Sequence, residues 1–292
     1  MDNFRVNTLI IGAGRSGTTS LYAHMAAHED VCFSYLKEVH YFSIDELYGR
    51  GEKYYHAFFK NCTGARILAS ADTYLLMDYD AIPRIRDYNP EMKIIVILRD
   101  PVARAYSSYH YSVNYGHHKA YSTFLDSMEA EKDIENEQNI VTRNNLGHFY
   151  GSLYHKHLSK WTEQFPREQI LLLETAELRG FPHLLLEKLA AFLNLTSFDD
   201  HVERENAAAI PRNKKLEKFL LDRDSFMRKM IRRLTPRFIK NLIMESGIVD
   251  KLHKVNRVES AVSPLSAEEA EKARLYFKDD MQNLKKDYGI EF

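Results

Sequence analysis

The stretch from Asn7 to Tyr22, NTLIIGAGRSGTTSLY, most constrains what this chain can fold into. An apolar run leads directly into a glycine-rich segment, which a helical pattern follows. A strand, turn and helix in this order form an anion-binding loop, because backbone N–H groups and the helix N-terminus point at the ligand. ATP-binding loops of this kind read G-x-x-x-x-G-K-[ST]. Gly12 and Gly17 have that spacing, but Thr18 stands at the lysine position, which leaves Arg15 as the cation within the loop.

Short apolar runs alternate with amphipathic helical patterns along the first part of the chain. The five expected strands are residues 6–11, 31–33, 66–69, 93–98 and 169–173. Strands separated by helical crossovers predict a parallel sheet with helices on both faces. In such sheets ligands bind beyond the carboxyl ends of the strands, where the loop after residues 6–11 would lie. The expected fold class is therefore α/β, a P-loop-type parallel sheet flanked by helices.

Helices are expected after the strands. Asp100 can cap a helix that begins at Pro101, and further helices are predicted over residues 144–165 and 182–195. Residues from 213 onward are predicted to form a mostly helical C-terminal extension. Its last helix has an apolar face made of Ala270, Ala273, Phe277, Met281, Leu284 and Tyr288. Because no linker-like segment interrupts the chain, we predict one domain over residues 1–292, with a sheet core at about 1–200 and a helical part at about 213–292.

Composition narrows the function classes. The 40 Lys and Arg residues nearly balance the 41 Asp and Glu residues, which disfavours a nucleic-acid partner. No leader-like segment or apolar run of membrane-spanning length is present, so we expect no membrane span and a cytoplasmic location. Cys32 and Cys62 are too few for a disulfide framework and lack metal-ligand spacing, so they are expected to be small buried thiols in a reducing cytoplasm.

Two motifs resemble those of sulfotransferases that use 3′-phosphoadenosine 5′-phosphosulfate (PAPS). GRSGTTSLY is similar to the family's 5′-phosphosulfate loop, in which a basic residue, here Arg15, precedes SGTT. IIVILRDPVARAYSSYHY resembles the 3′-phosphate site, where an arginine at a strand end and a serine in the next helix hold the phosphate. Arg99 and Ser107 occupy these positions, and a planar guanidinium with a short hydroxyl suits phosphate oxygens.

The resemblance is to the bacterial and glycan branch of the family, including heparan sulfate sulfotransferase domains. It covers most of the chain and implies PAPS as the co-substrate. The residues that it places at the nucleotide are Arg15, Ser16, Gly17, Thr18, Thr19, Ser20, Arg99 and Ser107. Arg212, in NAAAIPRNKK, has two readings: a loop arginine that closes over the 3′-phosphate, or a solvated surface residue.

The segment SYLKEVHYF resembles the KE…HFF segment of glycan sulfotransferases, whose glutamate is the proposed general base; Glu38 holds that position. His40 is a rival, because imidazole titrates near neutral pH and the phenol and steroid branch uses a histidine. That branch carries its histidine much further along the chain, which favours Glu38. Arg15 would stabilise the sulfuryl group and the bridging oxygen. No metal is expected, since a sulfuryl group carries less charge than a phosphoryl group.

The expected function is transfer of sulfate from PAPS to a hydroxyl or amine of an acceptor, with a carbohydrate favoured. Three alternatives stay open: a P-loop kinase or other NTPase, a sulfotransferase for a small lipid or phenolic alcohol, and a non-catalytic nucleotide-binding module. A kinase would need a lysine at Thr18. The sequence also departs from relatives in two places. Ser20 replaces the tryptophan that stacks on adenine in the small-molecule branch, and ASADTYL keeps only Tyr74 of the glycan motif EK-x-P-x-Y. Trp161 is predicted to lie in the core.

Overall fold

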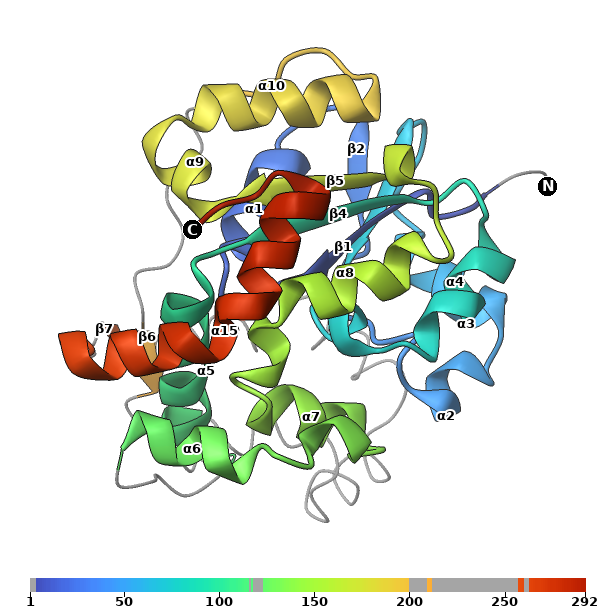
Figure 1. Cartoon of the computed structure of the whole chain (residues 1–292). Coiled ribbons are helices and arrows are strands. Elements are labelled where there is room, and N and C mark those ends of the chain that lie inside the picture. Colours follow the sequence, from blue (N-terminus) through green and yellow to red (C-terminus); the bar gives the residue numbers. More distant parts are fainter. Residues whose placement is uncertain (1–3, 116, 118–122, 200–208, 212–256, 260–262) are drawn as a thin grey trace.

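The computed structural model describes residues 4–115, 117, 123–199, 209–211, 257–259 and 263–292 (Figure 1). Five parallel strands form the main sheet in the order β2-β3-β1-β4-β5. Their bounds are β1 Thr8–Gly12, β2 Val31–Phe33, β3 Ile67–Ala71, β4 Lys93–Leu98 and β5 Ile170–Glu174. A separate antiparallel pair joins β6 (Ala209–Pro211) to β7 (Arg257–Glu259). The predicted fold class and all five predicted strands of the parallel sheet are confirmed.

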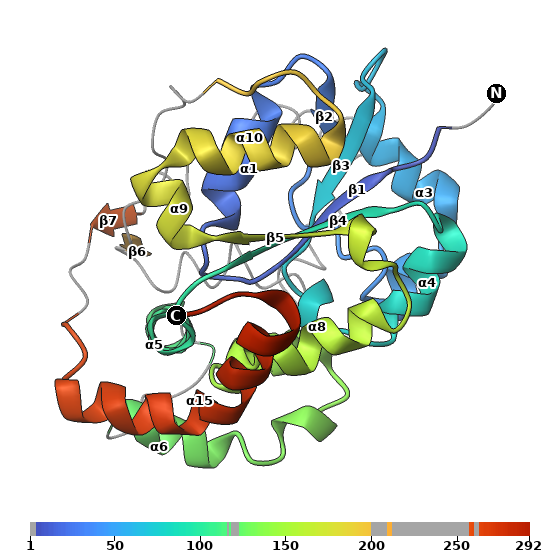
Figure 2. The ribbon, with the colours of Figure 1, turned by 45° about the horizontal axis from the view of Figure 1, so that its top comes forward.

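Helices cover both faces of the sheet. Figure 2 shows α1 (Thr18–Ala26), α9 (Thr175–Gly180) and α10 (Pro182–Leu193) on one side, with α4 (Ala81–Tyr88), α8 (Tyr154–Thr162) and α15 (Ala267–Tyr288) on the other. The remaining helices are α2 (Asp45–Tyr48), α3 (Glu52–His56), α5 (Pro101–Tyr115), α6 (Phe124–Ala130) and α7 (Ile140–Leu146). The central strands β1, β3 and β4 are buried on both faces, which explains why they read as continuous apolar runs.

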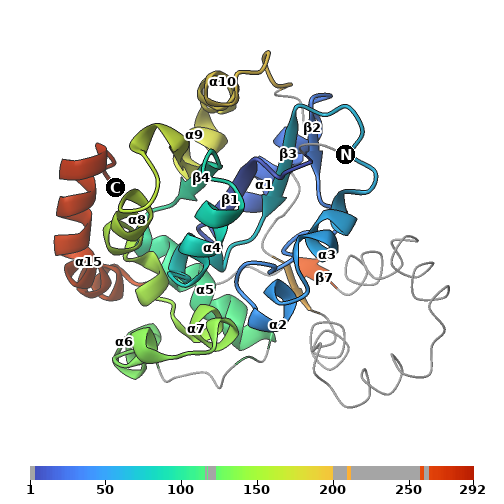
Figure 3. The same cartoon turned by 90° about the vertical axis from the view of Figure 1, so that its right-hand side faces the viewer.

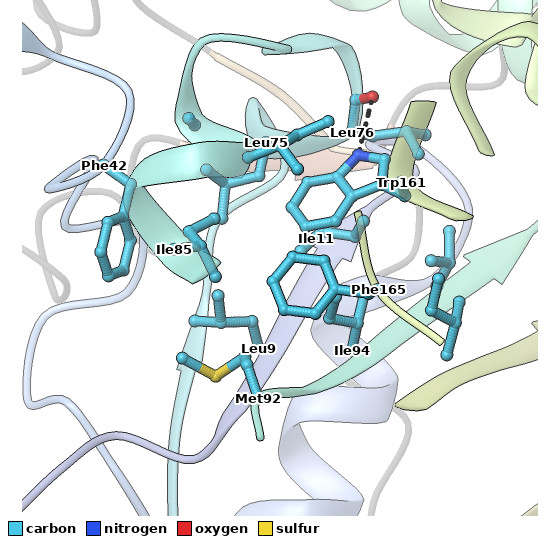
Figure 4. Close-up of a cluster of buried hydrophobic side chains, with 14 of the residues drawn as sticks. Leu9, Ile11, Phe42, Leu75, Leu76, Ile85, Met92, Ile94, Trp161 and Phe165 are labelled. Carbon is cyan, nitrogen blue, oxygen red and sulfur yellow. Dashed lines mark hydrogen bonds between the residues drawn. The ribbon is translucent and has the colours of Figure 1, made fainter. Parts of the chain in front are cut away.

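Alternate residues of β1 and β4 enter different cores, as the two-residue period of a strand requires. Ile10 packs with α1 and α10, while Leu9 and Ile11 pack with α4 and α8. Trp161 belongs to the cluster that contains Leu9 and Ile11. Its side chain is fully buried, and its indole Nε1 donates to the Leu76 carbonyl at 3.4 Å (Figure 4). The prediction that Trp161 belongs to the core is confirmed.

Helix α5 begins as predicted. Its first residue is Pro101, and the Asp100 carboxylate accepts a hydrogen bond from the Ala103 N–H at 2.8 Å. The cap therefore sets where the chain turns from the end of β4 into the helix.

The single helix predicted over residues 144–165 is wrong. Helix α7 ends at Leu146, a short 3₁₀ turn η4 (Tyr150–Ser152) follows, and α8 starts at Tyr154. The Glu131 carboxylate accepts hydrogen bonds from three consecutive N–H groups of this break, at 2.8, 2.8 and 3.0 Å. A side chain from the turn after α6 thus satisfies the donors that a continuous helix would satisfy itself.

The predicted C-terminal helix is present as α15. The Ser266 hydroxyl caps its start, and Gly289 ends it in the left-handed conformation. Ala273, Phe277 and Leu284, from the predicted apolar face, are buried. Figures 1 and 3 show α15 beside α8, and it also packs on α5 and α6. Arg212 and the helices predicted over residues 213–256 lie outside the described residues.

The expectation of two free thiols is wrong. Cys32 in β2 and Cys62, which follows the 3₁₀ turn η1 (Ala57–Phe59), form a disulfide with Cα atoms 5.6 Å apart. The return of the chain to the edge of β2 brings these cysteines together, and their separation of 30 residues gave no sign of it. In the described part of the chain, no helix combines the length and apolar character needed to cross a membrane.

Candidate active site

The glycine-rich loop connects β1 to α1 at the carboxyl edge of the sheet. Gly17, the residue before α1, has a φ of 96°, and Arg15 has a φ of 70°. This left-handed region suits glycine but is unfavourable for arginine, so other contacts must hold Arg15 in place. The Ser16 N–H donates to the Ala13 carbonyl at 3.1 Å and closes the turn.

Two neighbouring elements anchor the loop from beneath. The Thr175 hydroxyl, at the start of α9, donates to the carbonyls of Ser16 and Leu98. Ser16 is fully buried, and its hydroxyl lies beside that of Tyr154. The Tyr154 hydroxyl in turn donates to the Arg99 carbonyl at 2.9 Å. The loop and the end of β4 are therefore held in a fixed relation to each other.

The residues of the two sequence motifs meet at this edge. Arg15 Nε donates to Ser107 Oγ at 3.2 Å, and Arg99 Nη1 donates to the Arg15 carbonyl at 3.3 Å. The Arg15 guanidinium also lies over the Tyr111 ring, 4.8 Å from its centre. Arg15 and Ser107 are 92 residues apart in sequence, so the fold builds this cluster from β1, β4 and α5.

Positive charge gathers around Arg99. Burial holds the pKa of Arg99 below its usual range, and the charges of Arg179 in α9 and of Arg15 lower it further. Several cations gathered at one place favour a ligand with several negative charges. Arg179 was missed at the sequence level, because nothing in ETAELRG distinguishes it from a surface arginine.

Glu38 lies in the segment that follows β2. Its backbone N–H donates to the Ala71 carbonyl at 2.9 Å, and the Thr73 hydroxyl donates to its carboxylate at 3.2 Å. His40 Nδ1 lies 2.9 Å from the Asp72 carboxylate, and both side chains are buried. The turn after β3 thus holds the two candidate bases through neighbouring residues.

The surroundings of Glu38 make it a stronger base than an ordinary carboxylate. Burial raises its pKa, and so does the charge of Asp72, whereas His40, Lys37 and the Thr73 hydrogen bond lower it. A raised pKa gives a carboxylate a greater affinity for the proton that it would remove from an acceptor.

Lys37 links this segment to the phosphate loop. Its Nζ donates to Thr19 Oγ1 at 2.8 Å and lies 5.8 Å from the centre of the Tyr22 ring. The fold therefore brings a second cation to the start of α1, next to a loop whose own sequence contains only Arg15. Sequence reasoning missed Lys37, Asp72, Thr73 and Tyr111; for Lys37 the adjacency to Glu38 was the available signal. Ser20 lies in α1, one residue beyond Thr19.

His157, in α8, serves the packing. His157 is fully buried, with Nδ1 2.8 Å from the Tyr79 hydroxyl and Nε2 2.8 Å from the Tyr150 carbonyl. Burial lowers its pKa to about 3, which keeps the ring neutral. Among the described residues, no group of three or more His, Cys, Asp or Glu side chains is arranged to hold a metal ion.

Residues 6–255 match the sulfotransferase domain family. The chain belongs to the sulfotransferase family. The chain is 28% identical to the human bifunctional heparan sulfate N-deacetylase/N-sulfotransferase 2 over 200 residues, which are 65% of this chain and 22% of that protein. It is 27% identical to human heparan sulfate glucosamine 3-O-sulfotransferase 5 over 187 residues, covering 64% of this chain and 53% of that protein. The chain thus spans about a fifth to a half of the length of these relatives.

Solved structures show the same fold. A sulfotransferase from Alicyclobacillus acidocaldarius superposes with a TM-score of 0.59 at 27% identity, covering 70% of this chain and 87% of that one. The mouse sulfotransferase SULT7A1 complexed with PAP gives a TM-score of 0.50 at 16% identity, covering 97% of this chain and 86% of that one. At 16% identity this likeness concerns the fold alone.

Proposed function

We propose that this sulfotransferase moves the sulfuryl group of PAPS to a hydroxyl or amine of a carbohydrate. The observation that carries the proposal is the contact between Lys37 and Thr19, because it ties the segment bearing Glu38 to the phosphate loop. An in-line transfer between an acceptor and a bound nucleotide needs a base and an anion site that are fixed relative to each other.

The charges of the site suit this nucleotide. Arg15, the backbone N–H groups of the loop and Lys37 would bind the 5′-phosphosulfate, while Arg99 and Ser107 would bind the 3′-phosphate. The contact between Arg15 and Ser107 supports the assignment, since it brings the two halves of the proposed binding site together. Arg179 adds charge near Arg99, where ATP would offer no phosphate. When bound, PAPS supplies the sulfuryl group and a good leaving group, adenosine 3′,5′-bisphosphate.

The chain's own residues would move one proton and stabilise charge. Glu38 accepts the proton of the acceptor hydroxyl or amine as the new bond to sulfur forms. The bond between sulfur and the bridging oxygen breaks, and its electron pair leaves with the bisphosphate. Arg15 and Lys37 stabilise the negative charge that grows on that oxygen. His40, oriented by Asp72, is the alternative base.

The relatives bear on the kind of acceptor, and the disulfide bears on the cellular compartment. Relatives that act on heparan sulfate support a carbohydrate acceptor. The family match over residues 6–255 supports the proposal of one sulfotransferase domain. The Cys32–Cys62 disulfide favours an oxidising compartment over the expected cytoplasm, where thiols stay reduced.

The test measures transfer of labelled sulfate from PAPS to three groups of acceptors. These are oligosaccharides with free amino groups, oligosaccharides with hydroxyls only, and small phenols and aliphatic alcohols. We expect transfer to at least one oligosaccharide group and little to the small alcohols. Failure to bind adenosine 3′,5′-bisphosphate would contradict the proposal. Magnesium-dependent ATP turnover would instead support the NTPase alternative, and tight nucleotide binding without any transfer would support a binding module.

A further inference from the structure

Arg104 is a buried cation beneath the phosphate loop. It lies in α5, and only 2% of its surface is exposed. Its Nε donates to the Gly14 carbonyl at 2.9 Å, and its Nη1 donates to the His148 carbonyl at 3.0 Å. Gly151 leaves room for this guanidinium, because a Cβ there would lie 2.7 Å from Arg104 Nη1. The side chain therefore joins the loop to the break between α7 and α8.

The outer end of this connection is rigid. Ser108 and Ser112 follow Arg104 at steps of four residues, so all three lie on one face of α5. Ser108 Oγ lies 3.1 Å from His148 Nδ1, and Ser112 Oγ donates to the Asn145 carbonyl. The hydrogen bonds that the Glu131 carboxylate accepts from the His148 and Phe149 N–H groups also fix this break. Arg104 thus connects the loop to a segment of the chain that other hydrogen bonds already hold in place.

The contact at Gly14 controls the orientation of one peptide group. In a planar trans peptide the carbonyl of Gly14 and the N–H of Arg15 point in opposite directions. Rotating this peptide by half a turn would break the bond to Arg104 and would change the φ of Arg15, which is now 70°. Because the left-handed region is unfavourable for arginine, the loop needs such a contact to stay in this conformation.

We propose that Arg104 is a positioning residue that keeps the Gly14 carbonyl away from the anion site and the Arg15 N–H directed toward it. The ligand concerned is the 5′-phosphate end of the nucleotide. The inference deepens the proposed function and rests on it. It concerns the backbone of the loop, and so it is separate from the side-chain roles of Arg15, Arg99 and Ser107.

The experiment compares three ligands: adenosine 3′,5′-bisphosphate, adenosine 5′-monophosphate and adenosine 3′-monophosphate. Calorimetry gives the Kd of each for wild-type protein and for Arg104→Met. We expect the two ligands with a 5′-phosphate to bind about tenfold more weakly to the variant, because a charge-assisted contact that shapes their site is lost. The 3′-monophosphate should change less than twofold. Arg99→Ala should give the opposite pattern, since it removes the 3′-phosphate ligand.

The deciding quantity is the ratio of the Kd for a ligand with a 5′-phosphate to the Kd for adenosine 3′-monophosphate. Partial unfolding would weaken the binding of all three ligands alike and would leave this ratio unchanged, whereas loss of positioning would change it. Ser112→Ala is the matched control: it removes a buried hydrogen bond from the same face of α5 without a bond to the loop, and the ratio should stay unchanged. Arg104→Lys, which keeps the charge, should restore part of the selectivity and serves as the test if the methionine variant does not fold.

Two failures are distinguishable. Equal weakening of all three ligands, or no weakening, in the Arg104 variants would overturn the positioning role while leaving the proposed function intact. Wild-type protein that binds none of the three ligands would overturn the proposed function and this inference together.

Discussion

Glu38 and His40 share an unusual backbone conformation, with φ values of 58° and 57°. Val39, between them, is buried in the core. Each polar side chain then finds a partner after β3, Glu38 with Thr73 and His40 with Asp72. Residues other than glycine keep a left-handed conformation only where contacts with their surroundings hold them in it. Such residues are common at functional sites. The backbone at this segment thus supports the assignment of the base to one of these two residues.

Substitution of each candidate base should identify the one that acts. We expect Glu38→Gln to bind the nucleotide normally but to lower kcat by about 10² to 10⁴, the usual contribution of a general base. His40→Ala should lower kcat much less. Steady-state kinetics with saturating PAPS, together with calorimetry of nucleotide binding, measures both effects. Normal turnover in Glu38→Gln with a large loss in His40→Ala would move the role to His40.

The pH profile should respond to the two neighbours of Glu38 in opposite directions. A base works when ionised, so activity falls as pH drops through its pKa. Asp72 raises the pKa of Glu38, and the Thr73 hydrogen bond lowers it. Asp72→Asn should therefore move the acidic limb of kcat/KM to lower pH, and Thr73→Val should move it to higher pH. Shifts of both variants in the same direction would argue against Glu38 as the group that titrates.

At the scale of elements, β2 is the short edge strand that leads into the segment with Glu38. Its end is held by the Cys32–Cys62 disulfide and by the hydrogen bond from the Tyr35 N–H to the Phe58 carbonyl at 2.9 Å. A strand of three residues at the edge of a sheet has few ladder hydrogen bonds of its own. The crosslink therefore steadies the element from which the candidate base extends.

Reduction of the disulfide should lower the stability of the protein. For a closed loop of 30 residues, the loss of the crosslink costs about 3 to 4 kcal/mol in the chain-entropy relation. Thermal unfolding with and without dithiothreitol measures this, and the Tm of wild type should fall on reduction. A Cys32→Ser, Cys62→Ser double variant is the control, since its Tm should not respond. Two free thiols in native, unreduced protein would contradict the crosslink.

Across the whole molecule, the C-terminal helix packs against helices from the middle of the chain. Helix α15, close to the C-terminus, packs on α5, the helix that carries Ser107 and Arg104. Phe277 of α15 stacks on Phe149, with ring centres 5.6 Å apart, in the cluster that also contains Phe124. Helix α15 thus contacts the helix that carries part of the candidate site, but it contains none of the predicted ligand-binding residues.

Truncation of Phe277 should therefore destabilise the whole protein. We expect Phe277→Ala to lower the free energy of unfolding by about 3 to 5 kcal/mol, because a buried aromatic is replaced by a cavity. Leu275→Ala on the same helix is the matched control; its side chain is 65% exposed and should change stability by less than about 0.5 kcal/mol. Urea unfolding gives both values. Similar values for the two variants would mean that α15 is not part of the cooperative core.

Much of the fold could be predicted from local patterns. Strand positions, the parallel sheet, the Asp100 cap and the apolar face of α15 follow from residue periodicity and cap chemistry, which act over a few residues. The break at residues 147–153 could not, because Arg104 in α5 and Glu131 in the turn after α6 stabilise it. Side chains distant in sequence there replace the hydrogen bonds that a continuous helix would make.

In the loop at Asn7–Tyr22, too, some features follow from the local sequence and others from contacts between distant residues. Its glycines, its missing lysine and the arginine at position 15 are properties of the chain, and they already indicated an anion other than ATP. The contacts of Lys37 with Thr19, Arg15 with Ser107 and Arg104 with Gly14 join residues 18, 92 and 90 positions apart. The folding of the whole sheet and its helices brings such pairs together, because local periodicity carries no information about which distant residues will meet.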